Sequence, residues 1–222
     1  MTERTIAIIP AYNEAARVTA VVAKALPLVS EVVVIDDGST DNTAAIAQAA
    51  GATVLRHEQN RGKGAAIATA LEFFGKSNAE FAVFLDADGQ HDAAEIPHLV
   101  ETAQATGAGI MVGTRMHDTA SMPLVRRLTN RFTSWLTGRL AHQRIPDSQC
   151  GFRLLRRSVL ADLRLTTSGF ETETEMLIQA GRAGHKLASV PIRTIYREGR
   201  HSRIRPLRDT LKFIKLAGRY WR

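Results

Sequence analysis

The sequence lacks several features that would point to a function at once. Its 222 residues contain one cysteine, Cys150, so no disulfide can form within the chain, which suits a reducing compartment. No run approaches the roughly 20 apolar residues that cross a bilayer, and the N-terminus lacks the apolar region of a signal peptide. We therefore expect a cytoplasmic protein.

Common catalytic motifs are also missing. Neither Gly-x-Gly-x-x-Gly nor a P-loop occurs, which argues against a dinucleotide oxidoreductase and a P-loop kinase. Gly62-Lys63-Gly64 resembles part of a P-loop, but the upstream glycine and the Ser or Thr after the lysine are absent. No Gly-x-Ser-x-Gly, Cys-x-x-Cys or His-Glu-x-x-His is present, so the usual hydrolase, redox and zinc motifs are excluded.

Positive charge is concentrated at the C-terminal end. The net charge is +7, and residues 193–222 hold ten Arg or Lys against two acidic residues. Apolar residues alternate with these charges at helical spacing, which predicts a basic amphipathic helix over 204–222 that follows a domain of residues 1–203. Such helices lie on anionic membrane surfaces, although a helix packed on the domain with a solvated basic face is the alternative. Few aromatics interleave with the charge, so nucleic acid is not an expected partner.

Strand-like and helical segments alternate through the first half of the chain. Short β-rich apolar runs cover 5–9, 31–35, 53–56, 81–85 and 110–113. Helical spacing follows at about 16–26 (with Asn13 as N-cap), 44–50, 65–74 and 93–106. This alternation predicts an α/β fold with a mostly parallel central sheet flanked by helices.

Two carboxylates follow the strand at 81–85. Asp86 and Asp88 face the same way if the strand pleat continues. Two carboxylates facing one point repel each other unless a cation lies between them, and hard oxygen ligands suit Mg²⁺ or Mn²⁺. An Asp-x-Asp pair is common by chance, so a solvated turn is the alternative. We expect His91, beside the pair, to be a rim residue rather than a ligand.

Polar residues follow the other strands as well. They are Tyr12, Asn13 and Glu14 after the first strand, and Asp36 and Asp37 after the second. Because ligands bind at the carboxyl ends of parallel strands, these residues and the acidic pair are expected at one edge of the sheet. This coincidence favours a binding site over a solvated turn.

The second half is less regular. A helical stretch at about 124–136 has one apolar face, made by Leu124, Val125, Leu128, Phe132, Trp135 and Leu136, with Arg126, Arg127 and Arg131 nearby. It is either an ordinary amphipathic core helix or a helix whose face meets lipid while its arginines meet phosphate. Residues 147–153 are expected to form a turn entering a strand. A helix is expected from about Glu173 to Ala180, and Glu171, Glu173 and Glu175 fit helix-start acids as well as any catalytic role.

Six motifs, taken together, resemble glycosyltransferase family 2, most closely its polyprenyl-phosphate sugar synthases of the dolichyl-phosphate mannose synthase type. In chain order they are Ile9-Pro10-Ala11-Tyr12-Asn13-Glu14, Val34-Ile35-Asp36-Asp37-Gly38-Ser39-Thr40-Asp41, Asn60-Arg61-Gly62-Lys63-Gly64, Leu85-Asp86-Ala87-Asp88-Gly89-Gln90, Gly113-Thr114-Arg115 and Asp147-Ser148-Gln149-Cys150-Gly151-Phe152-Arg153. They span most of the chain and do not specify the sugar.

The resemblance implies a GT-A nucleotide-diphosphosugar transferase fold and an inverting hexosyltransferase. It implies that Pro10, Tyr12, Glu14 and Asp37 hold the base and ribose of a donor of the GDP-mannose or UDP-glucose class, and that Lys63 also contacts substrate. It assigns Mg²⁺ or Mn²⁺ to Asp86, Asp88 and Gln90, and it places Arg115 near the diphosphate. The metal ion then offsets charge on the leaving nucleoside diphosphate.

The acceptor decides what else the site needs. A polyprenyl phosphate is already anionic and needs cations rather than a general base, which suits Arg126, Arg127, Arg131, Arg197, Ser202 and Arg203. The segment 197–203 looks like the family's arginine followed by Gly, Ser and a basic residue, with Arg200 and His201 lengthening the spacing. A sugar hydroxyl acceptor would instead need a base, for which Glu173 is the candidate.

The leading expectation is therefore hexose transfer to a polyprenyl phosphate by an enzyme bound peripherally to the cytoplasmic face of the membrane, with a membrane protein as a possible partner. The first alternative is a soluble glycosyltransferase that acts on a glycan or small-molecule hydroxyl. The second is a non-catalytic nucleotide-sugar binding module, against which the complete acid pair with Gln90 speaks.

Overall fold

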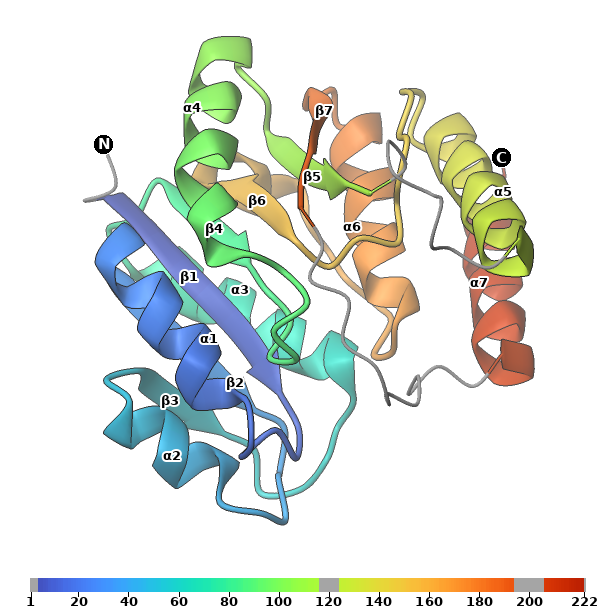
Figure 1. Cartoon of the computed structure of the whole chain (residues 1–222). Helices are drawn as coiled ribbons and strands as arrows, with labels where there is room; N and C mark the ends of the chain where they lie inside the picture. Colours follow the sequence, from blue (N-terminus) through green and yellow to red (C-terminus); the bar gives the residue numbers. More distant parts are fainter. Residues whose placement is uncertain (1–3, 116–123, 194–205, 222) are drawn as a thin grey trace.

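The architecture is a single seven-stranded sheet with helices on both faces (Figure 1). The structure, a computed structural model, describes residues 4–115, 124–193 and 206–221. The strands are β1 (Thr5–Ala11), β2 (Glu31–Asp36), β3 (Thr53–Arg56), β4 (Phe81–Phe84), β5 (Ile110–Thr114), β6 (Arg153–Arg156) and β7 (Leu187–Pro191). The α-helices are α1 (Val18–Ala25), α2 (Thr43–Ala49), α3 (Lys63–Lys76), α4 (Ile96–Thr106), α5 (Leu124–Leu140), α6 (Glu171–Arg182) and α7 (Pro206–Tyr220).

The sheet is mostly parallel, as the alternation of strands and helices predicted. Its strand order is β3-β2-β1-β4-β6-β5-β7, and only β6 runs antiparallel to its neighbours, β4 and β5. β1, β2 and β4 are apolar along almost their whole length because both faces of the sheet are covered. In Figure 1, α1, α2 and α4 lie in front of the sheet, whereas α3 and α6 lie behind it and contact each other.

Two predicted element starts are wrong by a few residues. Asn13 does not cap α1; the helix begins at Val18, and Asn13 adopts φ 52° while its side-chain oxygen accepts the Thr40 N–H at 2.8 Å. α6 begins at Glu171, two residues before the predicted start. In both cases the tertiary contacts of the loop, which sequence periodicity does not report, set the boundary.

Helix α5 exposes most of its apolar face, whereas an ordinary core helix would bury it. Its apolar residues are exposed, namely Leu124, Val125, Leu128, Phe132 and Trp135, whereas Leu136 is at the edge of burial. Its buried face carries the polar side chains of Asn130, Ser134 and Thr137, and near the C-terminal end of the helix Leu140 is buried as well. The interpretation of this apolar face as part of the core is therefore wrong.

Helices α5 and α7 lie side by side, with α6 between them and the sheet (Figure 1). A small second core joins the three helices and contains Leu136, Leu140, Ile178, Leu216 and Ala217. Two apolar residues of α7, Leu211 and Ile214, are exposed. The predicted boundary after residue 203 falls in 194–205, outside the described residues. Within the described parts of the chain, no helix combines the length and apolar character that a membrane span requires.

Candidate active site

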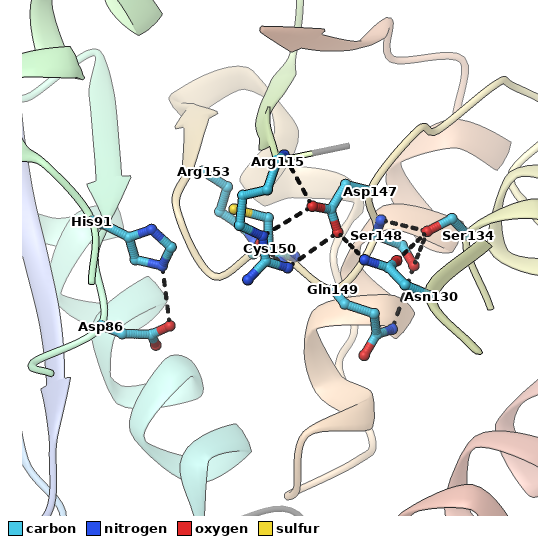
Figure 2. Close-up of polar contacts among 10 residues, drawn as sticks. All are labelled: Asp86, His91, Arg115, Asn130, Ser134, Asp147, Ser148, Gln149, Cys150 and Arg153. Carbon is cyan, nitrogen blue, oxygen red and sulfur yellow. Dashed lines mark hydrogen bonds and ion pairs between the residues drawn. The ribbon is translucent and has the colours of Figure 1, made fainter. Parts of the chain in front are cut away.

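The loop after β4 carries the acidic pair at the carboxyl edge of the parallel strands. Asp86 Oδ1 accepts a hydrogen bond from Lys63 Nζ at 2.8 Å. Asp86 Oδ2 lies 3.3 Å from His91 Nε2, a contact shown in Figure 2. Burial raises the pKa of Asp86, but Lys63 and His91 outweigh this effect and hold the pKa well below its ordinary value. Asp86 is therefore an ionised carboxylate whose two oxygens both have partners.

His91 is not a rim residue, so that prediction is wrong. Its side chain is only 4% exposed, and its ring stacks on Phe152 with ring centroids 5.4 Å apart. The stacking and the contact with Asp86 explain its burial. The sequence around His91 does not indicate whether this histidine is buried or lies at the rim of the site.

The second acid, Asp88, lies on the same loop rather than on a continued strand. β4 ends at Phe84, so the pleat does not extend to the pair as predicted. Asp88 Oδ1 accepts the backbone N–H of Gln90 at 2.8 Å, which closes a short turn. The loop thus keeps Asp86, Asp88 and Gln90 within five residues of one another.

This loop fits a divalent cation. Among residues 4–115, 124–193 and 206–221, no three His, Cys, Asp or Glu side chains form a group that could hold a metal ion. Mg²⁺, however, commonly binds through one or two carboxylates and keeps several waters, and the amide oxygen of Gln90 is a further hard donor. Asp86 Oδ1 already binds a cation, the ammonium of Lys63, so the position suits positive charge.

The glycines around Lys63 serve close packing. Gly62 has φ 95°, and a Cβ on Gly64 would lie 2.1 Å from Thr172 Oγ1 and 2.4 Å from the carbonyl carbon of Ser168. The Gly64 N–H also donates to the Ser168 carbonyl at 3.0 Å. This contact between the start of α3 and the start of α6 sets Lys63 beside Glu173.

Lys63 and Glu173 belong to a row of alternating charges. Lys63 Nζ lies 3.1 Å from Glu173 Oε2, and Glu173 Oε1 lies 3.3 Å from Arg153 Nη2. The buried Arg153 also donates to the main-chain carbonyls of Glu173 at 3.0 Å and Cys150 at 2.6 Å. The row runs in the order Asp86, Lys63, Glu173, Arg153, so each charged side chain lies next to one or two side chains of opposite charge.

A small pocket opens at this row of charges. Its lining residues come from β1, α3, β4 and the loop after it, α6 and the loop before β6. They are Pro10, Lys63, Ile67, Phe84, Leu85, Asp86, Gly151 and Glu173. Pro10, Lys63, Asp86 and Glu173 of the predicted site are thus brought together.

Asp37, predicted to contact base or ribose, organises the neighbouring loop. Its carboxylate accepts the backbone N–H groups of Arg61 at 2.9 Å and Gly62 at 2.8 Å, and Asp37 Oδ1 lies 2.7 Å from His57 Nδ1. Asp37 therefore holds the turn that leads into Lys63. Nothing in the sequence near Asp37 pointed to His57, which is 20 residues away.

Glu14 and Tyr12 lie just beyond β1. Glu14 is buried, its side chain contacts Arg17 at 3.1 Å, and its N–H donates to Thr43 Oγ1 at 2.8 Å. Tyr12 is half-buried at the same strand end. Their contacts with a donor stay predictions.

Arg115 is bound to a second, deeply buried acid. Its side chain contacts Asp147 at 3.1 Å and 3.3 Å, and Asn130 Nδ2 donates to the same carboxylate at 2.9 Å (Figure 2). Burial raises the pKa of Asp147, but Arg115 and these hydrogen bonds outweigh it, so the pKa lies below its ordinary value. The sequence placed Asp147 in a turn and gave no sign of its partners.

The same network holds the inner face of α5. Ser134 Oγ donates to Asn130 Oδ1 at 3.0 Å and accepts the Ser148 N–H at 2.9 Å (Figure 2). This explains why the polar side of the helix is the buried one. Cys150 lies beside the network, and burial raises the pKa of its thiol to about 12.

The other glutamates of α6 have structural contacts. Glu175 accepts hydrogen bonds from Thr166 and Thr167, which outweigh burial and lower its pKa. Glu171 Oε1 lies 3.6 Å from Lys212 of α7. These contacts fix the start of α6 on both sides of Glu173.

The predicted acceptor cations are only partly described. Arg127 and Arg131 lie on α5, half-buried and exposed respectively, along one flank of the exposed apolar residues. The side chain of Arg126 and residues Arg197, Ser202 and Arg203 lie outside the part of the chain that the structure describes.

The chain is similar to named glycosyltransferases over most of its length. It is 32% identical over 214 residues to UDP-N-acetylglucosamine–dolichyl-phosphate N-acetylglucosaminyltransferase of Methanococcus voltae, covering 86% of this chain and 85% of that protein. It is 28% identical over 216 residues to polyprenol monophosphomannose synthase of Mycolicibacterium smegmatis, covering 89% and 79% of the two chains.

A solved structure shares the fold. Glucosyl-3-phosphoglycerate synthase from Mycobacterium tuberculosis superimposes with a TM-score of 0.76 at 24% identity, covering 98% of this chain and 80% of that one. Another crystal structure of that enzyme contains Mg²⁺ and UDP. The likeness confirms the predicted GT-A fold. Residues 6–164 match the family model described as glycosyl transferase family 2, and the chain therefore belongs to that family of glycosyltransferases, as its motifs predicted.

Proposed function

We propose that the protein transfers a hexose, with inversion and with the help of Mg²⁺ or Mn²⁺, from a nucleotide-diphosphosugar to a polyprenyl phosphate at the cytoplasmic face of a membrane. The single observation that carries the proposal is the outward apolar face of α5, flanked by Arg127 and Arg131. A soluble acceptor gives no reason to expose two aromatic and three aliphatic side chains on one helix.

The donor side follows from the strand-end site. Pro10, Tyr12, Glu14 and Asp37 lie at the ends of β1 and β2, where a base and ribose are expected in such sheets. Asp86, Asp88 and Gln90 would hold the divalent ion, which supplies Lewis-acid stabilisation of the leaving diphosphate. Lys63 brings a further positive charge to the same pocket. Arg115 is 11% exposed and bound to Asp147, and we assign it a place near the diphosphate.

The acceptor side is supported by the contacts of Glu173. This carboxylate is held between Lys63 and Arg153, with contacts of 3.1 Å and 3.3 Å. Each of its oxygens therefore has a cationic partner within the protein, whereas a general base must place an oxygen within hydrogen-bond reach of the acceptor hydroxyl. An anionic phosphate acceptor needs no base, and the arginines of α5 supply the charge that would hold it.

Membrane contact follows from the same helix. Phe132 and Trp135 are 59% and 60% exposed, and neighbouring α7 exposes Leu211 and Ile214. Aromatic and aliphatic side chains beside arginines suit the boundary between acyl chains and anionic headgroups. We assign the basic helix of residues 204–222 to this membrane contact, next to a catalytic domain of residues 1–203. A membrane protein partner would bind at the same surface.

The relatives named above act, by their names, on dolichyl phosphate and polyprenol phosphate, which supports this acceptor class. The test is a screen of radiolabelled GDP-mannose, UDP-glucose and UDP-N-acetylglucosamine, each with Mg²⁺ or Mn²⁺, with and without polyprenyl phosphate, followed by organic extraction. Label that enters the organic phase only with both metal and lipid supports the proposal and identifies the donor.

Label confined to water-soluble products overturns the proposed acceptor. In that case the soluble hydroxyl-acceptor reaction becomes the better explanation, and Glu173→Gln, checked for folding and donor binding, decides whether Glu173 is its base. Binding of a donor without any turnover would leave the non-catalytic binding module.

A further inference from the structure

We propose that Lys63 and the divalent cation are alternative occupants of one oxygen, Asp86 Oδ1, and that Glu173 is the second partner to which Lys63 retreats when the cation binds. The inference rests on the proposed function, because it takes metal-dependent transfer as given. It adds a residue that sets the affinity for the metal and whose position reports metal binding.

The two oxygens of Asp86 have different partners. Asp86 Oδ2 lies 3.3 Å from His91 Nε2, and Gly151 lies so close to the carboxylate that a side chain there would clash with it. Asp86 Oδ1 is the atom that Lys63 contacts at 2.8 Å, and both residues line the pocket. A cation that enters through the pocket therefore meets the lysine ammonium at the oxygen it needs.

Glu173 lowers the free-energy cost of moving the Lys63 ammonium away from Asp86. Lys63 Nζ lies 3.1 Å from Glu173 Oε2 as well as 2.8 Å from Asp86 Oδ1, so it gives up one of two ionic contacts. A partly buried ammonium that lost both partners would carry a large desolvation penalty. The aromatic ring of Phe170, with its centroid 5.9 Å from Nζ, offers a further favourable contact on that side.

Arg153 keeps Glu173 in place during the exchange. It contacts the Glu173 carboxylate at 3.3 Å and donates to the main-chain carbonyl of the same residue at 3.0 Å. Glu173 is therefore positioned independently of Lys63. Asp86, by contrast, has a positive partner at Oδ1 whether Lys63 or the metal ion is there, so neither carboxylate of the pocket loses its positive partner.

The first test measures Mn²⁺ binding by electron paramagnetic resonance of the free ion for the wild type, Lys63→Met and Lys76→Met. Methionine keeps an unbranched side chain and removes the competing charge. Because the metal no longer has to displace a hydrogen-bonded ammonium from Asp86, Lys63→Met is expected to bind Mn²⁺ about tenfold more tightly or better. Lys76, at the other end of α3 and paired with exposed Glu72, is the matched control and should change nothing. Unchanged or weaker binding by folded Lys63→Met overturns the exchange.

The second test separates displacement from a long-range effect of charge, and it needs no variant. A crystal of the wild type grown with Mn²⁺ is expected to show the anomalous peak of the metal in contact with Asp86 and the Lys63 ammonium on Glu173 alone. A peak at Asp86 with Lys63 still bonded to Oδ1 overturns the exchange, whatever the affinity of Lys63→Met.

Failure of this inference can be told apart from failure of the proposed function. Metal-dependent transfer to lipid, together with either contrary result above, overturns the exchange alone. Transfer that is indifferent to chelation, with no Mn²⁺ binding by any of the three proteins, overturns the metal role in the proposed function and the exchange with it.

Discussion

The strand-end site and helix α5 differ in the direction in which their polar and apolar side chains face. Around Asp86 the charged groups face a pocket and the apolar residues of the strands lie behind them. On α5 the polar groups point inward to Asp147, and the aromatic residues point outward. The first arrangement is that of a site for a polar ligand in water. The second places an apolar surface outside the protein, which is stable where the surroundings are themselves apolar.

The largest effect is expected at the strand-end site. Asp88→Ala removes a predicted metal ligand from a loop, so transfer activity should fall by about 10³-fold while the fold persists. The measurement is initial rate with saturating Mn²⁺, alongside thermal unfolding. Asp88→Asn should lose activity equally, although its amide oxygen can still accept the Gln90 N–H and keep the turn. Glu101→Gln, on the exposed side of α4, is the control for loss of an acid. Full activity in Asp88→Ala would mean that the metal site lies elsewhere.

On the α5 side, the largest effect is expected on stability rather than on chemistry. Asp147→Ala leaves the nearly buried Arg115 without its carboxylate and should lower the free energy of unfolding by about 3–5 kcal/mol, measured by urea denaturation. A loss below about 1 kcal/mol would show that the inner face of α5 does not depend on this network.

The pH dependence of stability tests the same contribution of the Asp147 carboxylate. The pKa of Asp147 is depressed in the folded protein from an ordinary value of 3.8, so its stabilising contribution is complete above that pH. It is lost as the pH falls below 3.8 towards the folded pKa. The wild type should therefore lose more stability across this acid range than Asp147→Asn, which has no carboxylate to protonate.

A moderate effect is expected on the outer face of α5. The double variant Phe132→Gln and Trp135→Gln should bind vesicles of phosphatidylcholine with anionic phosphatidylglycerol roughly tenfold less tightly, with unchanged thermal unfolding. Thr129→Gln changes an exposed residue of α5 outside the apolar face and should bind like the wild type. Equal vesicle binding by all three proteins would assign the apolar face to another partner.

The smallest effect is expected at Cys150, between the two regions. Because burial raises the pKa of this thiol to about 12, it is almost entirely protonated at pH 8. Iodoacetamide at that pH should neither label the folded protein, as judged by mass spectrometry, nor reduce its activity. Rapid labelling without denaturant would show that the packing around the Arg115–Asp147 network opens readily.

The sequence predicted the strand-end site better than α5, because the signals that identify the site are local in the sequence whereas the contacts that orient α5 are not. Apolar runs that stop at polar residues identify β1, β2 and β4, because strand periodicity and strand ends are local. The partners of Asp37 and Asp147 lie 20 or more residues away, and no local pattern reports them. The contact of His91 with Asp86 is close in sequence, but burial by Phe152 is not.

For α5, the periodicity indicates that the helix has two faces but not which of them is inside. The usual assumption that the apolar face is buried fails here because Asn130 and Ser134 find buried partners in the 147–148 turn. For a similar reason, the sequence did not pair Lys63 with Glu173. Only the packing of Gly64 on Ser168 and Thr172 brings them together.

That packing has a consequence for synthesis of the chain. Lys63 and Asp86 are translated well before Glu173, which follows Lys63 by 110 residues. At about 5–20 residues per second, the nascent chain carries Lys63 and Asp86 for about 5–20 s before Glu173, the second partner of Lys63, is made. The first four strands therefore have time to pair on the ribosome, whereas the site matures only when α6 has been made.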